Sequence, residues 1–115
     1  MANSRRKGKT YELEVAAILR LHHLDARRGQ QYSGANGDPD VVCEALGRYH
    51  LECKRRAKQI SAADMYKFME QADRDKRPGQ VPVVVHRIDQ EGSLVTMRID
   101  DWIDMAKKAE GVDDE

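Results

Sequence analysis

Asp40, Glu52 and Lys54 are the residues of this sequence whose types and spacing suit metal-assisted chemistry. In an alternating strand, Glu52 and Lys54 project from one face while Leu51 and Cys53 project from the other. Two carboxylates and an ammonium on one surface suit a hard cation, because Mg²⁺ prefers oxygen ligands and keeps several waters for a phosphate to replace. The chemistry expected of such a set is phosphodiester hydrolysis, with the lysine orienting or helping to deprotonate the attacking water.

A hairpin would bring Asp40 to the other two residues. Strands are predicted over Asp40–Glu44 and Tyr49–Lys54, with a turn around Leu46 between them. Asp40 and Glu52 lie six residues on either side of Leu46, so folding at that point places the two carboxylates close together. Asp40 also follows a Gly-Asp-Pro turn, and loops of this kind often present functional groups.

An alternative is that Glu52 and Lys54 form an ordinary exposed pair on a strand, worth roughly a few tenths of a kcal/mol. Spacing alone favours that alternative. The apolar face opposite the pair, and the turn that precedes Asp40, favour the catalytic interpretation. Asp38 in that turn is a secondary candidate, a helper at the site, because an aspartate before proline more often caps its own backbone.

The apolar pattern predicts an α/β domain with a mixed sheet flanked by helices, in the order αβββαββα. A capping box of Ser61 and Asp64 marks the start of the second helix. The other predicted elements are a first helix over Thr10–His23, strands over Asp25–Gln31, Val81–Ile88 and Leu94–Ile99, and a last helix that Asp100 and Asp101 open around Trp102.

The length of 115 residues predicts one domain, with a basic arm over residues 1–9 and an acidic tail over residues 111–115. No apolar run approaches the roughly 18 residues that a membrane span requires, and the N-terminus lacks the apolar stretch of a secretory signal. Cys43 and Cys53 lack CxxC spacing and nearby histidines, so reduced, buried thiols are expected instead of a zinc site. We therefore expect a soluble cytoplasmic protein without a membrane partner.

The charges are unevenly distributed although the formal net charge is +0. Residues 1–58 hold 12 Lys and Arg against 7 Asp and Glu, and residues 59–115 hold 8 against 13. Residues 1–58, the basic half of the chain, are therefore expected to bind phosphate. A solvated charged surface would give the same pattern. The basic residues that flank the catalytic candidates, and are expected to contact DNA phosphates, are Arg5, Arg6, Lys7, Lys9, Arg27, Arg28, Arg55, Arg56 and Lys58.

Few aromatic residues accompany these basic residues. Only Tyr32 and Tyr49 lie nearby, so stacking of single-stranded bases has little support. Recognition of duplex shape and backbone is the better interpretation. The 4 histidines show no metal-binding spacing and are expected to be structural or to face DNA.

The residues around the catalytic candidates resemble the PD-(D/E)xK nuclease superfamily. The pattern Gly-Asp-Pro-Asp40 followed by Leu-Glu52-Cys-Lys54 is similar to the signature of that superfamily. The resemblance implies a restriction-endonuclease-like core, in which Asp40 and Glu52 bind the metal and Lys54 is the catalytic lysine. It also implies a second-tier role for Gln71, on the second helix, where many of these nucleases place an assisting glutamine; a solvated polar residue is the alternative.

A narrower resemblance is to the archaeal-type Holliday junction resolvases. Lys7-Gly8 followed by Glu12 in an amphipathic helix, with Ser33-Gly34 before the turn, is similar to their arrangement. This resemblance implies that Glu12 is a catalytic acid and third metal ligand, and that Ser33 lies beside the site and contacts DNA. Helical periodicity does not choose between Glu12 and Glu14, so the choice of Glu12 depends on the family spacing.

The function that this resemblance implies is a Mg²⁺-dependent, structure-selective endodeoxyribonuclease that resolves four-way junctions in DNA recombination and repair, with Mn²⁺ as the alternative ion. Its partners would be branched or duplex DNA and a second copy of the chain, because a junction needs two symmetric incisions and one site makes one. The apolar patch for such a homodimer would come from the Val81–Ile88 strand, the second helix or the Trp102 helix, among which the sequence does not choose. The alternatives are another PD-(D/E)xK nuclease of restriction or repair type and a non-catalytic DNA-binding module.

Overall fold

The computed structural model describes residues 3–30 and 39–113, and the side chains of residues 8–30 and 39–113. Its elements follow the predicted order αβββαββα. They are α1 (Asn3–Leu21), β1 (Ala26–Arg28), β2 (Val41–Cys43), the short 3-10 helix η1 (Glu44–Leu46), β3 (Tyr49–Arg56), α2 (Ala62–Asp75), β4 (Val81–Ile88), β5 (Leu94–Thr96) and α3 (Ile99–Glu110).

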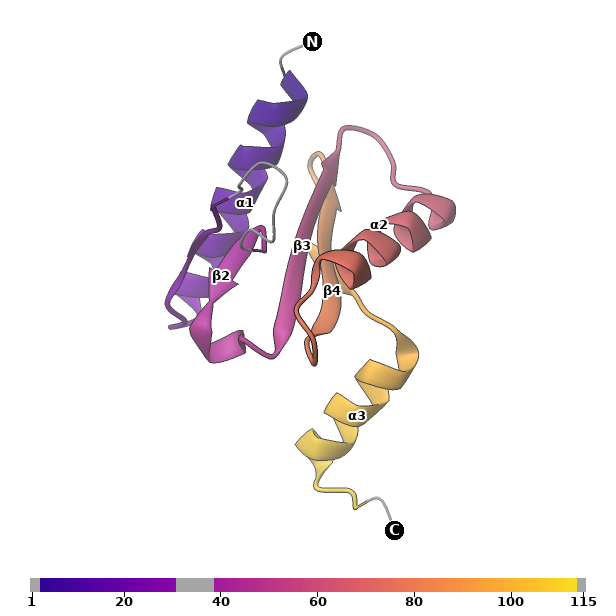
Figure 1. Ribbon diagram of the computed structural model, residues 1–115. Helices are drawn as coiled ribbons and strands as arrows, with labels where there is room; N and C mark the ends of the chain where they lie inside the picture. The colour runs from indigo at the N-terminus through magenta and orange to yellow at the C-terminus, as the bar shows by residue number, and fades with distance from the viewer. Residues whose placement is uncertain (1–2, 31–38, 114–115) are drawn as a thin grey trace.

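The strands form one mixed sheet in the order β1-β2-β3-β4-β5. β3 and β4 run parallel, and every other neighbouring pair runs antiparallel. A parallel pair needs a crossover connection, and α2 supplies it between β3 and β4 (Figure 1). The predicted α/β fold, a mixed sheet flanked by helices, is therefore confirmed.

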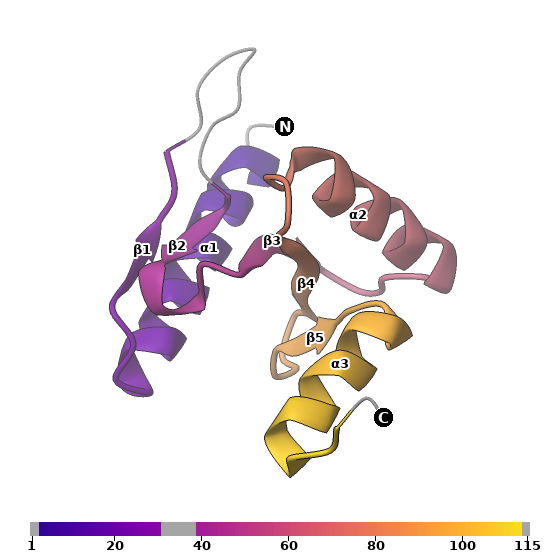
Figure 2. The ribbon, with the colours of Figure 1, turned by 60° about the horizontal axis from the view of Figure 1, so that its bottom comes forward.

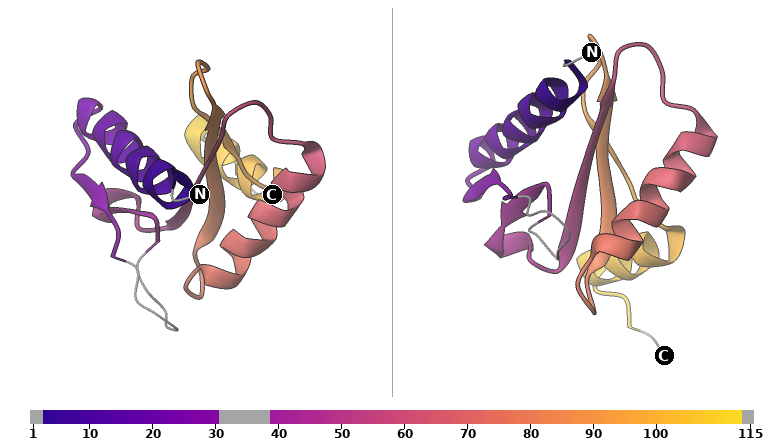
Figure 3. Two further views of the ribbon diagram at one scale, coloured as in Figure 1. Left: turned by 90° about the horizontal axis from the view of Figure 1, so that it is seen from above. Right: turned by 45° about the horizontal axis from the view of Figure 1, so that its top comes forward.

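Helices cover the two faces of the β3–β4 pair, with α1 on one side and α2 on the other (Figure 3). On the α1 side, Tyr11 and Val15 belong to one buried apolar cluster with Leu51 and Cys53. The cluster on the α2 side consists of Phe68, Met69, Ala72 and Val84. The alternation predicted for β3 is confirmed, because its apolar residues face α1 and leave the opposite face for polar ones.

Helix α1 is longer than predicted. It begins at Asn3 and not at Thr10, so residues 3–9 of the predicted basic arm are helical. Arginine and lysine are good helix formers and the run contains no proline, so its polarity does not prevent helix formation. The basic residues at the start of the chain therefore continue the helix that carries Glu12.

β1 covers only Ala26–Arg28 of the predicted Asp25–Gln31, of which Gln31 lies outside the described residues. Two further predicted strands are also shorter in the structure. β2 ends at Cys43 because the chain turns into the 3-10 helix at Glu44. β5 ends at Thr96, and Ile99, which was predicted to belong to the strand, is the first residue of α3. Both differences lie at element ends, where local hydrogen bonding competes with strand pairing.

The helix signals read from the sequence are confirmed at α2. Ser61 Oγ accepts a 3.0 Å hydrogen bond from the Asp64 N–H, and the Asp64 carboxylate accepts a 3.2 Å hydrogen bond from the Ser61 N–H. This capping box starts the helix, and Pro78 follows shortly after its end at Asp75.

Within the described residues, no helix combines the length and the apolar character needed to cross a membrane.

Candidate active site

The hairpin of β2 and β3 brings Asp40 to Glu52. Val41 pairs with Leu51 in an antiparallel register. Continuing this register by one residue places Asp40 opposite Glu52, which is the pairing predicted for a fold around Leu46. Asp40, directly before β2, and Glu52 on β3 therefore share one face of the sheet.

Asp40 is held between β1 and β3. Its Oδ2 accepts a 2.8 Å hydrogen bond from the backbone N–H of Cys53, the residue between Glu52 and Lys54. Its backbone carbonyl accepts a 2.8 Å hydrogen bond from the N–H of Gly29, directly after β1. The sheet itself therefore sets the position of this carboxylate.

Glu52 is a buried carboxylate, only 4% exposed. Its Oε1 lies 3.0 Å from Nε2 of His50, which is 3% exposed. Its Oε2 lies 3.7 Å from Nζ of Lys54. Burying a carboxylate is costly unless it has polar partners, so His50 and Lys54 stabilise Glu52 in this position.

Lys54 is fixed from the side of α2. Its Nζ donates a 2.8 Å hydrogen bond to Oε1 of Gln71. The same ammonium lies over the ring of Phe68, 5.1 Å from the ring centroid. Gln71 is therefore in direct contact with the candidate catalytic lysine, and its assisting role stays a prediction.

The two acids of α1 point to different parts of the sheet. Glu12 Oε1 accepts a 2.7 Å hydrogen bond from Nε of Arg28, and its charge reaches Asp40. Glu14 instead accepts hydrogen bonds of 2.7 and 2.9 Å from the guanidinium of Arg87 on β4. The structure thus separates two residues that helical periodicity treats alike, and Glu12 is the one beside the Asp40 and Glu52 pair.

The cluster of acids changes the ionisation of Asp40. Burial, followed by the negative charge of Glu52, raises the pKa of Asp40 to about 7, with a further contribution from Glu12. The Cys53 N–H and the Lys54 ammonium lower that pKa without cancelling the increase. A raised pKa in a cluster of carboxylates is typical of functional sites, because a bound cation relieves the repulsion.

The same surroundings keep the thiol of Cys53 protonated. Burial and the charge of Asp40 raise its pKa. Cys43 and Cys53 are both buried and without a disulfide bond, as predicted.

The carboxylates of Asp40 and Glu52 suit Mg²⁺ as two ligands that leave its other coordination positions open. Mg²⁺ is commonly held by one or two carboxylates, with water and substrate phosphate completing its coordination. In the part of the chain that the structure describes, no group of three or more His, Cys, Asp or Glu side chains is placed to hold a metal ion. Asp40 and Glu52 are the pair expected to hold the ion, and Glu12, expected as a third ligand, accepts a hydrogen bond from Arg28.

Several basic residues expected to contact DNA have acidic partners within the chain. These ion pairs are Arg28–Glu12, Arg55–Asp89 and Arg56–Asp64, at 2.7, 3.0 and 3.1 Å. Lys9, Arg27 and Lys58 have exposed side chains. The side chains of Arg5, Arg6 and Lys7, together with residues Ser33 and Asp38, lie outside the described residues. Lys9, Arg27 and Lys58 therefore present exposed basic side chains that a phosphate could reach.

His50 is the residue of this site that the sequence interpretation did not single out. It was expected to be structural or DNA-facing, and it is buried against Glu52. The signal was present, because His50, Glu52 and Lys54 alternate along one strand and must share a face.

Comparisons with known proteins place the chain in a family. A family model described as phage putative PDDEXK endonuclease matches residues 3–112 of the chain. No curated protein sequence matches the chain. Among solved structures, the chain is similar to Hjc, a Holliday junction resolvase from the archaeal hyperthermophile Archaeoglobus fulgidus, with 19% sequence identity and a TM-score of 0.46 over 79% of this chain and 72% of that one.

Proposed function

This chain belongs to that family of phage PDDEXK endonucleases, and we propose that it is a Mg²⁺-dependent, structure-selective endodeoxyribonuclease that hydrolyses phosphodiesters in four-way junction DNA. Mn²⁺ is the alternative ion. The observation that carries the proposal is the convergence of Asp40, Glu52 and Lys54 on one hairpin, with the Cys53 N–H joining the first acid to the other two residues.

Each residue of the site has a separate task. When bound, Mg²⁺ would polarise the scissile phosphate and make a coordinated water more acidic. Asp40 and Glu52 would hold the ion, and Glu12 would add negative charge beside them. His50 engages Oε1 of Glu52, which directs Oε2 toward Lys54.

Lys54 acts on the water or the phosphate. Gln71 accepts one hydrogen bond from its ammonium and so orients the remaining N–H groups. An ammonium in this position can orient an attacking water and offset the negative charge that develops on the phosphate. The 3.7 Å separation from Glu52 keeps the positive charge next to the acids that would bind the ion.

The preference for four-way junctions is supported by the resolvase-like order of the Glu12 helix, the Ser33-Gly34 segment and the hairpin. A junction needs two symmetric incisions, so the proposal includes a homodimer. Exposed basic residues such as Lys9 and Lys58 would meet the phosphate backbone, and the scarcity of aromatic residues near the basic ones favours branched or duplex DNA over single strands.

Two other functions fit part of the same evidence. Another PD-(D/E)xK nuclease of restriction or repair type would use the same residues on different DNA. A non-catalytic DNA-binding module would retain the fold without cutting. The Lys54–Gln71 hydrogen bond favours an enzyme, because a binding module has no need to orient a lysine beside Asp40 and Glu52.

A substrate panel separates these functions. The protein is incubated in Mg²⁺ with a labelled four-way junction, a duplex of the same sequence and the single strand, and EDTA serves as the control. At least tenfold faster cutting of the junction, with paired symmetric nicks, supports the proposal. Equal cutting of the duplex indicates a nuclease of another type, and failure to cut any DNA in Mg²⁺ or Mn²⁺ indicates the binding module.

A further inference from the structure

Phe68 on α2 lies against two cations of β3. Its ring centroid is 5.1 Å from Nζ of Lys54 and 5.3 Å from Cζ of Arg56. Lys54 and Arg56 are two residues apart on one strand, so their side chains leave the same face of the sheet. Helix α2 packs beside β3 and β4 (Figure 2). Because the face of an aromatic ring is negative, this one ring attracts both cations.

The neighbours of Phe68 on its helix bind the same two cations. Asp64 lies four residues before Phe68 and Gln71 lies three residues after it, so the three side chains share one side of α2. Asp64 accepts a 3.1 Å hydrogen bond from Arg56, and Gln71 accepts a 2.8 Å hydrogen bond from Lys54. Phe68 is therefore the middle member of a row of side chains that fixes both cations.

Packing alone does not require an aromatic residue at this position. Phe68 is 9% exposed, and the other buried residues of its cluster are Met69, Ala72 and Val84, none of which is aromatic. An aliphatic side chain would exclude water equally well, but it would present no negative face to an ammonium. The ring is thus the feature of Phe68 that its cationic neighbours use.

The ring should act more strongly on Lys54 than on Arg56. The side chain of Lys54 is 25% exposed and that of Arg56 is 48% exposed, and attraction to a ring is stronger where water is excluded. A ring is also only a weak hydrogen-bond acceptor. The N–H groups that Lys54 does not donate to Gln71 therefore stay available to a water or a phosphate.

We propose that Phe68 is a positioning residue of the site, whose ring holds the ammonium of Lys54 within reach of Gln71 and Glu52. The importance of this position for cleavage rests on the proposed function, which gives Lys54 its catalytic task. The position of the ammonium does not depend on that task. It can therefore be measured in the free protein, without DNA or metal.

Ring fluorination tests the attraction with little change in packing. Phe68 is the only phenylalanine of the chain, so growth on phenylalanine that carries one, two or three ring fluorines changes this residue alone. Each fluorine withdraws electron density from the face of the ring and weakens its attraction for a cation. The ring should shift the NMR signals of the ε-methylene of Lys54. Across the series these signals should move stepwise toward those of an exposed lysine such as Lys58.

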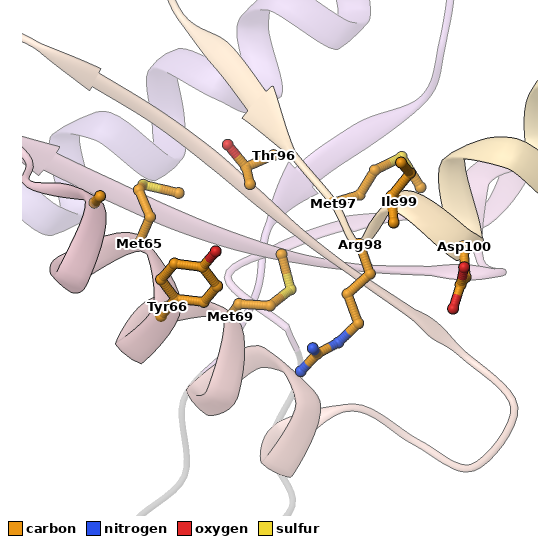
Figure 4. Close-up of a pocket in the computed structure, with 9 residues that line it drawn as sticks. Met65, Tyr66, Met69, Thr96, Met97, Arg98, Ile99 and Asp100 are labelled. Carbon is orange, nitrogen blue, oxygen red and sulfur yellow. The ribbon is translucent and has the colours of Figure 1, made fainter.

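Cleavage of a four-way junction at saturating enzyme shows whether this position matters for catalysis. The ring with three fluorines should slow the cut by about fivefold, and fewer fluorines should give intermediate rates. Phe68→Leu should slow it at least as much; if that variant does not fold, the fluorine series decides. Tyr66→Leu is the matched control and should cut at the wild-type rate. Tyr66 is 73% exposed on the same helix and lines a pocket whose walls include neither Lys54 nor Arg56 (Figure 4).

Two further variants show through which cation the ring acts. In Arg56→Ala the fluorine series should slow cleavage by the same factor, whereas in Lys54→Ala it should have no further effect, because the ammonium is already absent. Lys54 signals or cleavage rates that stay constant across the series, or an effect that disappears in Arg56→Ala, would overturn the proposal. A protein whose Lys54 signals move stepwise but that cuts no DNA would contradict the proposed function and still support the contact between the ring and the ammonium.

Discussion

The backbone N–H of Cys53 donates a 2.8 Å hydrogen bond to Oδ2 of Asp40, which ties the acid before β2 to the residue between Glu52 and Lys54 on β3. This bond lies just past the Val41–Leu51 pair, where the side chain of Asp40 meets the backbone of β3. The hydrogen bond consequently anchors the site to the sheet. The arrangement also holds the carboxylates of Asp40 and Glu52 close together, and the repulsion between their negative charges has measurable consequences.

Asp40→Asn should stabilise the metal-free protein at neutral pH. Burial and the charge of Glu52 raise the pKa of Asp40 to about 7, so ionising it disfavours the folded state. Below its ordinary pKa of 3.8, Asp40 is protonated in both the folded and the unfolded protein, and its contribution to the free energy of unfolding is fully present. That contribution is lost as the pH rises toward 7, because the unfolded protein releases the proton first. The loss is at most roughly 4 kcal/mol, at about 1.4 kcal/mol for each pKa unit. Thermal melts in EDTA should show a higher Tm for Asp40→Asn at pH 7.

The control for this experiment is Asp73→Asn, an exposed position on α2. Its melting temperature should follow that of the wild type at every pH. Adding Mg²⁺ should raise the Tm of the wild type but not that of Asp40→Asn, since only the wild type keeps both ligands. If Asp40→Asn melts at the wild-type temperature at both pH 4 and pH 7, the repulsion is absent.

His50 should control metal binding through Glu52. His50→Leu removes the hydrogen bond to Oε1 and leaves the buried carboxylate free to reorient, whereas His50→Gln keeps a donor. We expect a metal affinity lowered about tenfold or more in His50→Leu and partly recovered in His50→Gln, with DNA affinity unchanged. Mn²⁺ binding measured by calorimetry checks this without a cleavage assay. Equal Mn²⁺ affinities in both variants and the wild type would show that His50 has no effect on metal binding and only packs against Glu52.

Glu12 and Glu14 form a matched pair on one helix. Glu12→Gln removes charge that acts on Asp40, so it should weaken Mg²⁺ binding and slow cleavage at limiting metal. Glu14→Gln breaks the contact with Arg87 and should lower stability by about 1 kcal/mol without changing the metal requirement. A Mg²⁺ titration of the cleavage rate distinguishes them. If Glu14→Gln changes the Mg²⁺ requirement and Glu12→Gln does not, Glu14 is the α1 acid that belongs to the site.

DNA affinity should depend on the exposed lysines. Lys9→Ala combined with Lys58→Ala should weaken binding with little sequence dependence and reduce the slope of log K against log salt by roughly 2. Arg55→Ala and Arg56→Ala should add to the loss, although they also break the bonds to Asp89 and Asp64. Arg77→Ala, at the opposite end of the sheet, is the control. Fluorescence anisotropy at several salt concentrations decides this, and an unchanged slope would mean that the basic half is only a solvated surface.

Local sequence signals predicted the central hairpin well. The symmetric spacing of Asp40 and Glu52 about Leu46 sets the strand register, and alternation along β3 separates its apolar and polar faces. The capping box at Ser61 is likewise a local signal, and it is confirmed. These features follow from neighbours in the sequence, so they need no knowledge of the tertiary structure.

Features that depend on distant partners could not be predicted in this way. The bond between Lys54 and Gln71 and the bond between Arg55 and Asp89 join separate elements, and no spacing rule relates them. Glu12 and Glu14 have similar neighbours on the helix, so only the positions of Arg28 and Arg87 distinguish them. The choice among dimer surfaces was open for the same reason.

Single-turnover cleavage of a labelled four-way junction, with saturating enzyme in Mg²⁺, tests the central claim most directly. Asp40→Asn, Glu52→Gln and Lys54→Ala should each slow the cut by about 100-fold or more, while the exposed Glu44→Gln on the same hairpin cuts at the wild-type rate. Lys54→Arg should not recover fully, because a guanidinium stays protonated and its donors have a different geometry. Wild-type rates in the Asp40, Glu52 and Lys54 variants would contradict the assignment of this hairpin as the active site.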